Sequence, residues 1–197
     1  MNILIIGANG FTGRRILNDL VAREIYNITA CSLRNDIQSG DGYQFIRADI
    51  RNASEVRALF KEVCPDVVIN TSALSVPDFC ETHHNEARAT NITAVEHLAR
   101  ACEQYGSRFI HLSTDFVFDG RTDRLYTEED EPNPVNYYGI TKLEGEERVA
   151  ECCGNYAIVR VVVVYGKALP GQHGNIVQLV ANKLRSGETI RVVSDQW

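Results

Sequence analysis

The chain has 197 residues, 44% of them hydrophobic, which is enough to bury one full core and leaves room for one domain. Its formal net charge of −6 gives no basic footprint for nucleic acid, and no apolar run approaches the ~20 residues that span a bilayer. The N-terminus lacks the basic start and the cleavage site of a signal peptide, so we expect a cytoplasmic protein.

The first predicted unit is a strand, a glycine turn and a helix. An apolar run over residues 3–6 is followed by Gly7, Gly10 and Gly13, and apolar residues then recur at helical spacing from position 16 to position 21. This order opens a dinucleotide-binding fold, in which free N–H groups at the start of the helix bind the pyrophosphate. A side chain at these glycines would block the turn or hold the phosphates away. An ordinary glycine-rich turn is the weaker alternative.

Strands and helices alternate along the rest of the chain. Further strands are predicted over residues 28–33, 43–46, 66–70, 109–112, 157–165 and 189–193, and helices over 52–63, 85–105, around Tyr138 and over 175–185. The polar segment 119–136 contains two prolines and is predicted to be a loop. The alternation implies parallel strands with helices on both faces of the sheet. We therefore predict one doubly wound α/β domain of the Rossmann type over residues 1–197.

Polar residues gather at the predicted strand ends. Ligands of such sheets bind beyond the carboxyl ends of the strands. These ends supply Gly7, Arg34, Asp49, Ile50, Asn70, Thr71, Ser72, Ala73, Ser113, Thr114, Asp115, Tyr165 and Gly166. We expect all of them to line one crevice.

Arg34 bears on the choice of cofactor. In the NAD-binding form of this fold, an acid about 20 residues beyond the glycines binds the 2′-hydroxyl of the ribose. Here Ser32, Leu33 and Arg34 occupy that place, and Asp36 lies slightly beyond it. An arginine suits a 2′-phosphate, which a carboxylate would repel, so the sequence favours NADPH, with NADH as the alternative. Arg34 as a solvated loop residue is the other interpretation.

Tyr138 and Lys142 are four residues apart, so a helix places them on one face. A nearby cation lowers the pKa of a phenol, which would make Tyr138 a proton donor or acceptor near neutral pH. One exposed lysine does not supply the whole shift, and a bound cationic nicotinamide is the candidate for the remainder. Taken alone, a chance surface pair is the commoner explanation of this spacing.

No metal site is predicted. The six cysteines include no CxxC pair, which favours reduced thiols over a disulfide framework. His83, His84, His97 and His111 show no ligand spacing, so solvated or packed roles are expected for them.

Several motifs together resemble the extended short-chain dehydrogenase/reductases. They are GANGFTG at the N-terminus, the residues 70–73, Asn91, HLSTDFVFDG at 111–120 and NPVNYYGITKLEGE at 133–146. Within that superfamily, STDFVFDG, YGITKLEGE and the closing residues 193–196 look most like the dTDP-4-dehydrorhamnose reductases. The resemblance covers essentially the entire chain.

The resemblance implies a catalytic triad of Thr114, Tyr138 and Lys142. In the family's mechanism, a nicotinamide delivers hydride to the C4 ketone of a nucleotide-linked 6-deoxyhexose, and Tyr138 protonates the developing alkoxide. Thr114 would hydrogen-bond the same oxygen, and Lys142 would bind the nicotinamide ribose. Tyr137 is excluded as the phenol, because Thr141 stands four residues beyond it. A strand-end hydroxyl that satisfies a turn is the alternative role of Thr114.

The resemblance also implies a set of cofactor-binding residues. They are Gly7, Asn9, Gly10, Phe11, Thr12, Gly13, Arg34, Asp49, Ile50, Thr71, Ser72, Ala73, Asn91, Tyr138 and Lys142. Asp49 and Ile50 look like the family's adenine-contacting pair, with a helix-capping role as the alternative for Asp49.

In the resembled family, Asp195 and Gln196 introduce a further stretch that completes the sugar-nucleotide pocket, and this chain stops at Trp197. We therefore expect the small substrate domain to be largely absent here. The expected partner is a nucleotide sugar, and the resemblance is compatible with a homodimer. A non-catalytic dinucleotide-binding subunit is the second hypothesis, because a regulatory subunit of methionine adenosyltransferase resembles the same family. A nucleotide-sugar epimerase or dehydratase is the nearest rival among enzymes.

Overall fold

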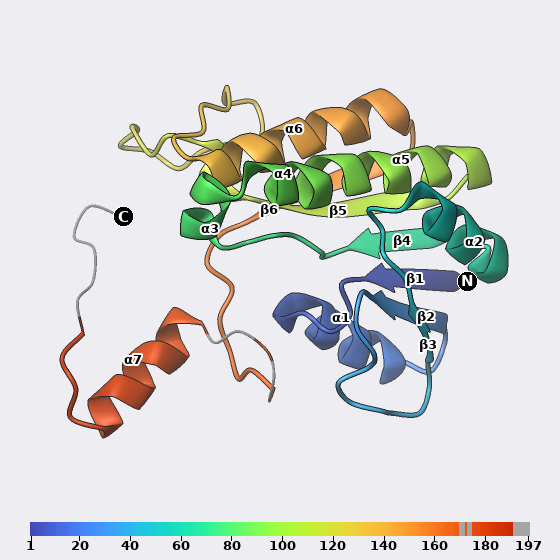
Figure 1. Cartoon of the computed structure of the whole chain (residues 1–197), viewed down its shortest axis with the longest axis horizontal. Helices are drawn as coiled ribbons and strands as arrows, with labels where there is room; N and C mark the ends of the chain where they lie inside the picture. Colours follow the sequence, from blue (N-terminus) through green and yellow to red (C-terminus); the bar gives the residue numbers. More distant parts are fainter. Residues whose placement is uncertain (170–171, 173–174, 191–197) are drawn as a thin grey trace.

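Six parallel strands form one sheet in the order β3-β2-β1-β4-β5-β6 (Figure 1). The computed structural model describes residues 1–169, 172 and 175–190. The strands are β1 (Asn2–Ile6), β2 (Asn27–Ser32), β3 (Gln44–Arg47), β4 (Val67–Asn70), β5 (Arg108–Thr114) and β6 (Tyr156–Val161). The order reverses between β1 and β4, which is where a doubly wound sheet binds its ligand. The predicted fold class is confirmed.

The connections between strands are mostly helical. The helices are α1 (Phe11–Val21), α2 (Ala53–Val63), α3 (Pro77–Thr82), α4 (His84–Arg88), the π-helical turn η1 (Ala89–Thr93), α5 (Ala94–Tyr105), the 3-10 turn η2 (Asp115–Val117), α6 (Tyr137–Cys152) and α7 (Ile176–Arg185). The single helix predicted over 85–105 is therefore three joined pieces. Gly106 ends it in the left-handed conformation, with φ of 69°.

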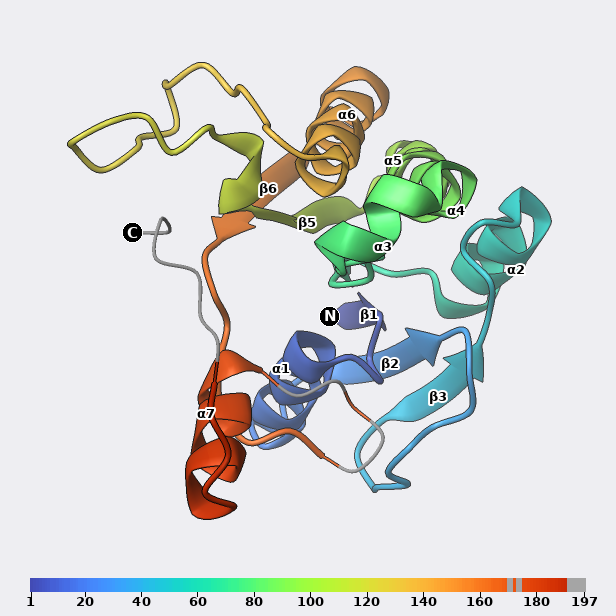
Figure 2. The ribbon, with the colours of Figure 1, turned by 60° about the vertical axis from the view of Figure 1, so that its left-hand side comes forward.

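Helices lie on both faces of the sheet (Figure 2), and each face has its own core of buried apolar side chains. Helix α1 packs Leu17 against Ile5 and Ala30 on one face. On the other face, helices α2, α5 and α6 bury Phe60, Leu98 and other apolar side chains against the same strands. The continuous apolar runs of β1 and β2 follow from this, because strands covered on both sides have no solvent face. Helix α7 lies apart from this core and has no buried residue (Figure 1).

The strand predicted over 157–165 was too long. It ends at Val161, which pairs with Thr114, the last residue of β5. Strand β6 lies at the edge of the sheet, so it loses its only neighbour at that point. Val162 and Val163 are exposed beyond it. The strand predicted over 189–193 falls largely outside the described residues.

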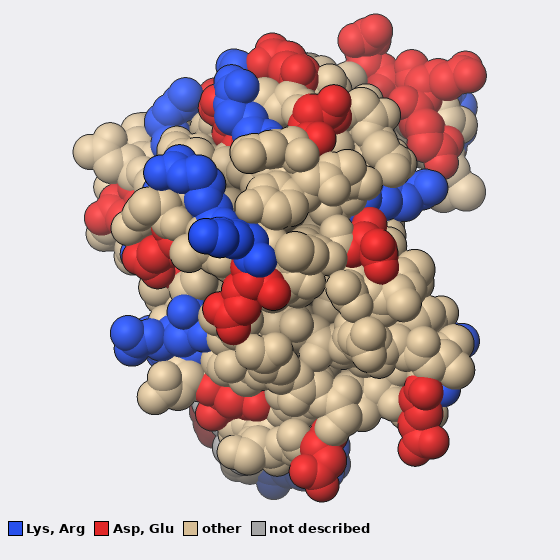
Figure 3. Space-filling model, turned by 90° about the vertical axis from the view of Figure 1, so that its right-hand side faces the viewer, with Lys and Arg blue, Asp and Glu red and all other residues tan. Residues whose placement is uncertain are grey.

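Charges of both signs are mixed over the surface. On the face drawn in Figure 3, Lys and Arg side chains stand beside Asp and Glu side chains. Among the described helices, none is both long enough and apolar enough to cross a membrane.

Two glycines let helix α6 lie directly on its neighbours. A Cβ at Gly139 would be 2.2 Å from the carbonyl oxygen of Phe116, and one at Gly145 would be 2.4 Å from the carbonyl oxygen of Asn91. Both neighbours are backbone atoms that cannot turn away. Because α6 carries Tyr138 and Lys142, these contacts set how close both residues come to the end of β5.

We expect Gly145→Ala to lower the free energy of unfolding by about 1–3 kcal/mol, because the added methyl group forces α6 away from Asn91. Urea unfolding measures the change. Gly154→Ala is the matched control, since its Cβ would meet only the flexible Glu103 carboxylate at 3.7 Å. The control should change stability by no more than about 0.5 kcal/mol. Equal unfolding midpoints for the two variants would contradict the close-contact argument.

Candidate functional site

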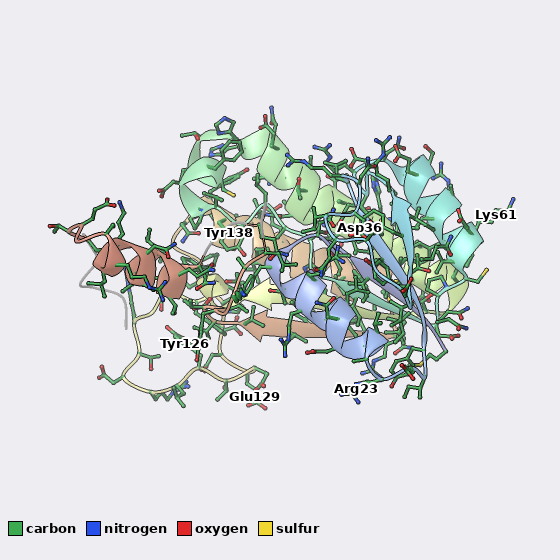
Figure 4. The ribbon with its side chains drawn as sticks, turned by 90° about the horizontal axis from the view of Figure 1, so that it is seen from below. Arg23, Asp36, Lys61, Tyr126, Glu129 and Tyr138 are labelled. Carbon is green, nitrogen blue, oxygen red and sulfur yellow. The ribbon has the colours of Figure 1, made fainter. Side chains whose placement is uncertain are left out.

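A cleft of about 850 Å³ opens at the carboxyl ends of the central strands. It has the size of a site for a small molecule or cofactor. The predicted site residues that line it are Gly7, Asn9, Gly10, Phe11, Thr12, Arg34, Asp49, Ile50, Thr71, Ser72, Ala73, Thr114, Tyr138 and Lys142. Of the predicted residues, Gly13 and Asn91 do not line it, nor do the strand-end residues Asn70, Tyr165 and Gly166, so the expectation that all strand-end residues share one crevice was wrong for these three. Figure 4 shows Tyr138 toward the middle of the molecule, whereas Tyr126 and Glu129 lie on an outer loop.

The glycine turn packs closely against the chain after β4 and leaves the start of helix α1 without a side-chain cap. Gly7 has φ of +82°, and a Cβ there would be 2.8 Å from the backbone nitrogen of Ser72. Helix α1 begins just after Gly10, and no side chain caps its first N–H groups. Phe11 and Thr12, the first residues of the helix, line the cleft. Uncapped N–H groups and the positive end of the helix dipole fit a diphosphate.

Gly13 and Asn91 lie behind the walls of the cleft. A Cβ at Gly13 would be 2.3 Å from the carbonyl oxygen of Gly7, so this glycine allows α1 to approach the turn. Asn91 is fully buried in η1, where its amide bonds both backbone groups of Leu74, at 2.8 and 3.1 Å, and the Thr141 hydroxyl at 3.0 Å. The geometry gives both residues a supporting position.

The loop after β2 holds Arg34 at the cleft and turns Asp36 away from it. The Asn9 amide donates to the backbone oxygens of Arg34 and Asn35, at 3.3 and 2.9 Å. Asp36 forms an ion pair with the buried Arg14 and accepts the Tyr43 hydroxyl at 2.6 Å. Burial opposes ionisation of Asp36, but its bonds to Tyr43 and Arg14 prevail and lower its pKa. The Asp36 carboxylate is therefore ionised, and the Arg14 guanidinium balances its charge at a place that does not line the cleft.

Asp49 keeps its carboxylate on Arg51. Their atoms Oδ2 and Nη2 are 2.7 Å apart, and this bond lowers the pKa of Asp49. The capping role considered for Asp49 is filled by Asn52, whose side chain accepts from the Ser54 nitrogen at 3.0 Å. Asp49 and Ile50 both line the cleft.

Thr114 and Tyr138 are buried next to each other at the end of β5. Burial is the main influence on Tyr138 and raises its pKa to about 12, while the hydrogen bond to Thr114 lowers it. Phe116 covers the phenol edge-on, with ring centroids 5.7 Å apart. Lys142 is not among the causes of the shift. The expectation that the lysine lowers the Tyr138 pKa is therefore wrong for the chain without a cofactor, because desolvation is the dominant influence on the phenol.

Lys142 is almost completely buried, with 1% of its surface exposed. Its Nζ donates to the Leu112 carbonyl oxygen at 2.7 Å. Burial lowers its pKa from 10.5 to about 8, and the Glu146 carboxylate raises it. Glu146 itself is bound by the Arg160 guanidinium, with Nη2 and Oε2 2.6 Å apart. The chance surface pair considered for Tyr138 and Lys142 is excluded by their burial.

Two further polar groups were given no role from the sequence. Ser113, expected at the crevice as a strand-end residue, lines the cleft, and its buried hydroxyl has no hydrogen-bond partner among the described residues. The Gln172 amide donates to the backbone oxygens of Asn9 and Gly10, both at 3.0 Å. These residues are more than 160 positions away in the sequence, so no local pattern predicts the contact. Within the described ranges, no group of three or more His, Cys, Asp or Glu side chains could hold a metal ion.

Comparison with known proteins identifies the family. A family model described as the RmlD substrate binding domain matches residues 1–197. The chain belongs to this family. The dTDP-4-dehydrorhamnose reductase of Shigella flexneri is 31% identical over 203 residues, which cover all of this chain and 61% of the relative. A solved dTDP-4-dehydrorhamnose reductase from Bacillus anthracis, in complex with NADP, is 30% identical with a TM-score of 0.85.

The RmlD-type relatives confirm the resemblance stated from the sequence. That solved structure is matched over 98% of this chain and 63% of its own length, so the chain spans less than two thirds of both reductases. The methionine adenosyltransferase 2 subunit beta of Bos taurus is 33% identical over 165 residues, covering 84% of this chain and 47% of that subunit. Both functional classes considered from the sequence thus have relatives at similar identity.

The buried Lys142 makes a prediction about stability and pH. The unfolded chain holds this proton up to pH 10.5, whereas the folded chain releases it above about pH 8. Between these values the unfolded state binds more protons, so stability rises with pH. We expect the stability of the wild type, relative to Lys142→Met, to rise by on the order of 3 kcal/mol from pH 8 to pH 10.5.

Urea unfolding at several pH values measures this difference. Subtracting the variant removes the contributions of all other titrating groups. Lys61→Met is the control, because the Lys61 side chain is exposed to water and should show no comparable rise. A flat difference for Lys142→Met would show that the buried amine is protonated throughout.

Proposed function

We propose that the protein uses NADPH to reduce the C4 ketone of a nucleotide-linked 4-dehydro-6-deoxy sugar, in the manner of dTDP-4-dehydrorhamnose to dTDP-L-rhamnose. The observation that carries this proposal is the shared cleft: Thr114, Tyr138 and Lys142 line the same cleft as the uncapped helix start at Gly10. The reductase relatives supply the class of substrate. Because the chain spans only part of their length, the proposal concerns the whole protein.

Tyr138 is suited to donate a proton. With a pKa raised to about 12, its phenol is protonated at neutral pH. The nicotinamide would supply the hydride that turns the ketone into an alkoxide. Tyr138 would pass its proton to that oxygen, and the neighbouring Thr114 hydroxyl would hydrogen-bond it as negative charge develops. For this, the Thr114 hydroxyl must leave the Asp115 carboxylate, to which it now donates at 3.0 Å.

Lys142 would hold the nicotinamide ribose. Its fixed bond to the Leu112 carbonyl oxygen orients the amine and leaves further N–H groups for ligand hydroxyls. Its position on the cleft wall supports this role. A cation there would also stabilise the Tyr138 phenolate once the proton has left.

The loop after β2 supports NADPH as the cofactor. Arg34 lines the cleft, and Asp36, the acid nearest to it in the sequence, is neutralised by Arg14 away from the lining. A 2′-phosphate would meet a guanidinium here and no free carboxylate. The NADP complex of the Bacillus anthracis relative agrees with this choice.

A non-catalytic subunit is the second candidate, favoured by the subunit beta relative. It would need the dinucleotide cleft but not a buried phenol beside a buried amine. The burial of Tyr138 and Lys142 at one end of the cleft therefore supports the enzyme.

We expect Tyr138→Phe to lower kcat for NADPH oxidation with dTDP-4-dehydrorhamnose by about 10²–10⁴-fold, because the proton donor is lost. NADPH absorbance measures turnover of the natural protein. Tyr137→Phe is the matched control: its phenol is adjacent in sequence and its ring stacks on His84, with centroids 3.8 Å apart. The control should retain its rate. Turnover by Tyr138→Phe at the wild-type rate would contradict the proposed mechanism.

We expect Arg34→Ala to weaken NADPH binding about tenfold and to leave NADH binding unchanged, because only NADPH carries the 2′-phosphate that a charged hydrogen bond would hold. Fluorescence titration of the 197-residue chain measures both affinities. Arg15→Ala removes an exposed arginine of α1 with the same change in net charge. Equal losses for both cofactors, or the same loss in the control, would contradict the role of Arg34.

A further inference from the structure

His111 is a fully buried, titratable residue that the proposed reaction does not use. It lies in β5, and its ring bridges two site elements. The atom Nε2 is 3.3 Å from the Lys142 Nζ, and Nδ1 is 3.0 Å from the amide nitrogen of Asn70 at the end of β4. Burial and the nearby Lys142 both lower the His111 pKa, so the ring is neutral. A neutral imidazole carries one proton, and its position decides what Lys142 meets.

The amide of Asn70 has only one orientation available. Its Oδ1 accepts the backbone N–H of Ser72 at 3.1 Å and the Ser72 hydroxyl at 2.6 Å. A backbone N–H can only donate, so this atom must be the oxygen. The NH₂ group of Asn70 therefore faces His111 and donates to Nδ1.

This bond fixes the tautomer of His111. Because Nδ1 accepts from Asn70, the ring proton must lie on Nε2. The Nε2–H group then points at the Lys142 amine. An ammonium would set two donors against each other, whereas a neutral amine has a lone pair that accepts the bond. One N–H of the amine still donates to Leu112.

We propose that His111, oriented by Asn70, is a positioning residue that favours the neutral amine form of Lys142 while the cleft contains no cofactor. In that form, hydrogen bonds run in one direction from Ser72 through Asn70 and His111 to Lys142 and Leu112. Among the described residues no carboxylate is hydrogen-bonded to the Lys142 amine, so its buried ammonium form is disfavoured.

The surrounding charges are compatible with this arrangement. On α6, Glu146 attracts a proton to Lys142, but Arg160 of β6 binds that carboxylate with three contacts of 2.6–3.2 Å. Tyr138 is protonated at neutral pH. Asp115 of η2 and Cys80 of α3 are further ionisable groups at this end, and both act on Tyr138.

This arrangement couples cofactor binding to the protonation of Lys142, a step that rests on the proposed function. Ribose hydroxyls would add oxygen acceptors for Lys142 and so favour its ammonium form. Cofactor binding would then raise the proton affinity of Lys142. The cation would be favoured when Tyr138 loses its own proton and disfavoured when the cleft is empty.

The test is nuclear magnetic resonance of the cofactor-free chain, so it does not depend on whether the protein binds NADPH or turns over a sugar. Ring ¹⁵N shifts should show the His111 proton on Nε2. The sequence has four lysines, and the side-chain ¹⁵Nζ signal of Lys142, assigned with Lys142→Met, should titrate at lower pH than the others. A proton on Nδ1 in the wild type would overturn the proposal, with no variant needed.

Asn70→Leu removes the amide donor and keeps the number and branching of the side-chain heavy atoms. His111 can then change tautomer and accept from an ammonium, so the midpoint of Lys142 should rise by about one pH unit, a tenfold change in its proton affinity. Burial alone predicts an unchanged or lower midpoint, which would overturn the proposal. Ser107→Ala is the control: it removes a buried hydrogen bond of 2.6 Å to Pro65, just before β5, and should leave the midpoint unchanged.

Discussion

The close contact of helix α6 with the carboxyl end of β5 is the constraint on which the site depends. Gly139 and Gly145 remove the side chains that would separate α6 from the backbone of η2 and η1. As a result, the Lys142 amine reaches the Leu112 carbonyl oxygen, and Tyr138 is buried against Phe116. Because both side chains start from α6, the position of this helix decides how deeply they are buried and so their proton affinities.

Tyr138 and Lys142 are buried at this end of the cleft, and two carboxylates near the cleft are neutralised by arginines. Arg14 neutralises Asp36 beside the loop after β2, and Arg160 neutralises Glu146, a buried residue of α6 that acts on Lys142. Both carboxylates thereby lose much of their charge near the groups that would meet a phosphate or a nicotinamide. A buried ion pair contributes little net stability, so these two pairs are better explained by the field they leave in the cleft.

The part of the site that could be predicted from the sequence is the part encoded locally. The glycine turn, the strand-end Thr114 and the spacing of Tyr138 and Lys142 are short motifs, and the rule for strand ends brings them to one cleft. The direction of the Tyr138 pKa shift was predicted wrongly, because it depends on packing by segments distant in the chain. The bond between Asn70 and His111 joins residues 41 positions apart, and no spacing rule reveals it.

The π-helical turn η1 has a consequence for how this segment tolerates length changes. Such a turn holds one residue more than the regular helix around it. Deleting one residue between Ala89 and Thr93 would therefore restore regular winding and leave the helix on either side facing the same neighbours. Residues within the turn, such as Asn91 on Leu74, would shift, whereas Leu98 would stay in the core. The π-helical turn thus accommodates one additional residue within a continuous helix. The residues of the turn support the cleft, and the residues after it pack on the sheet.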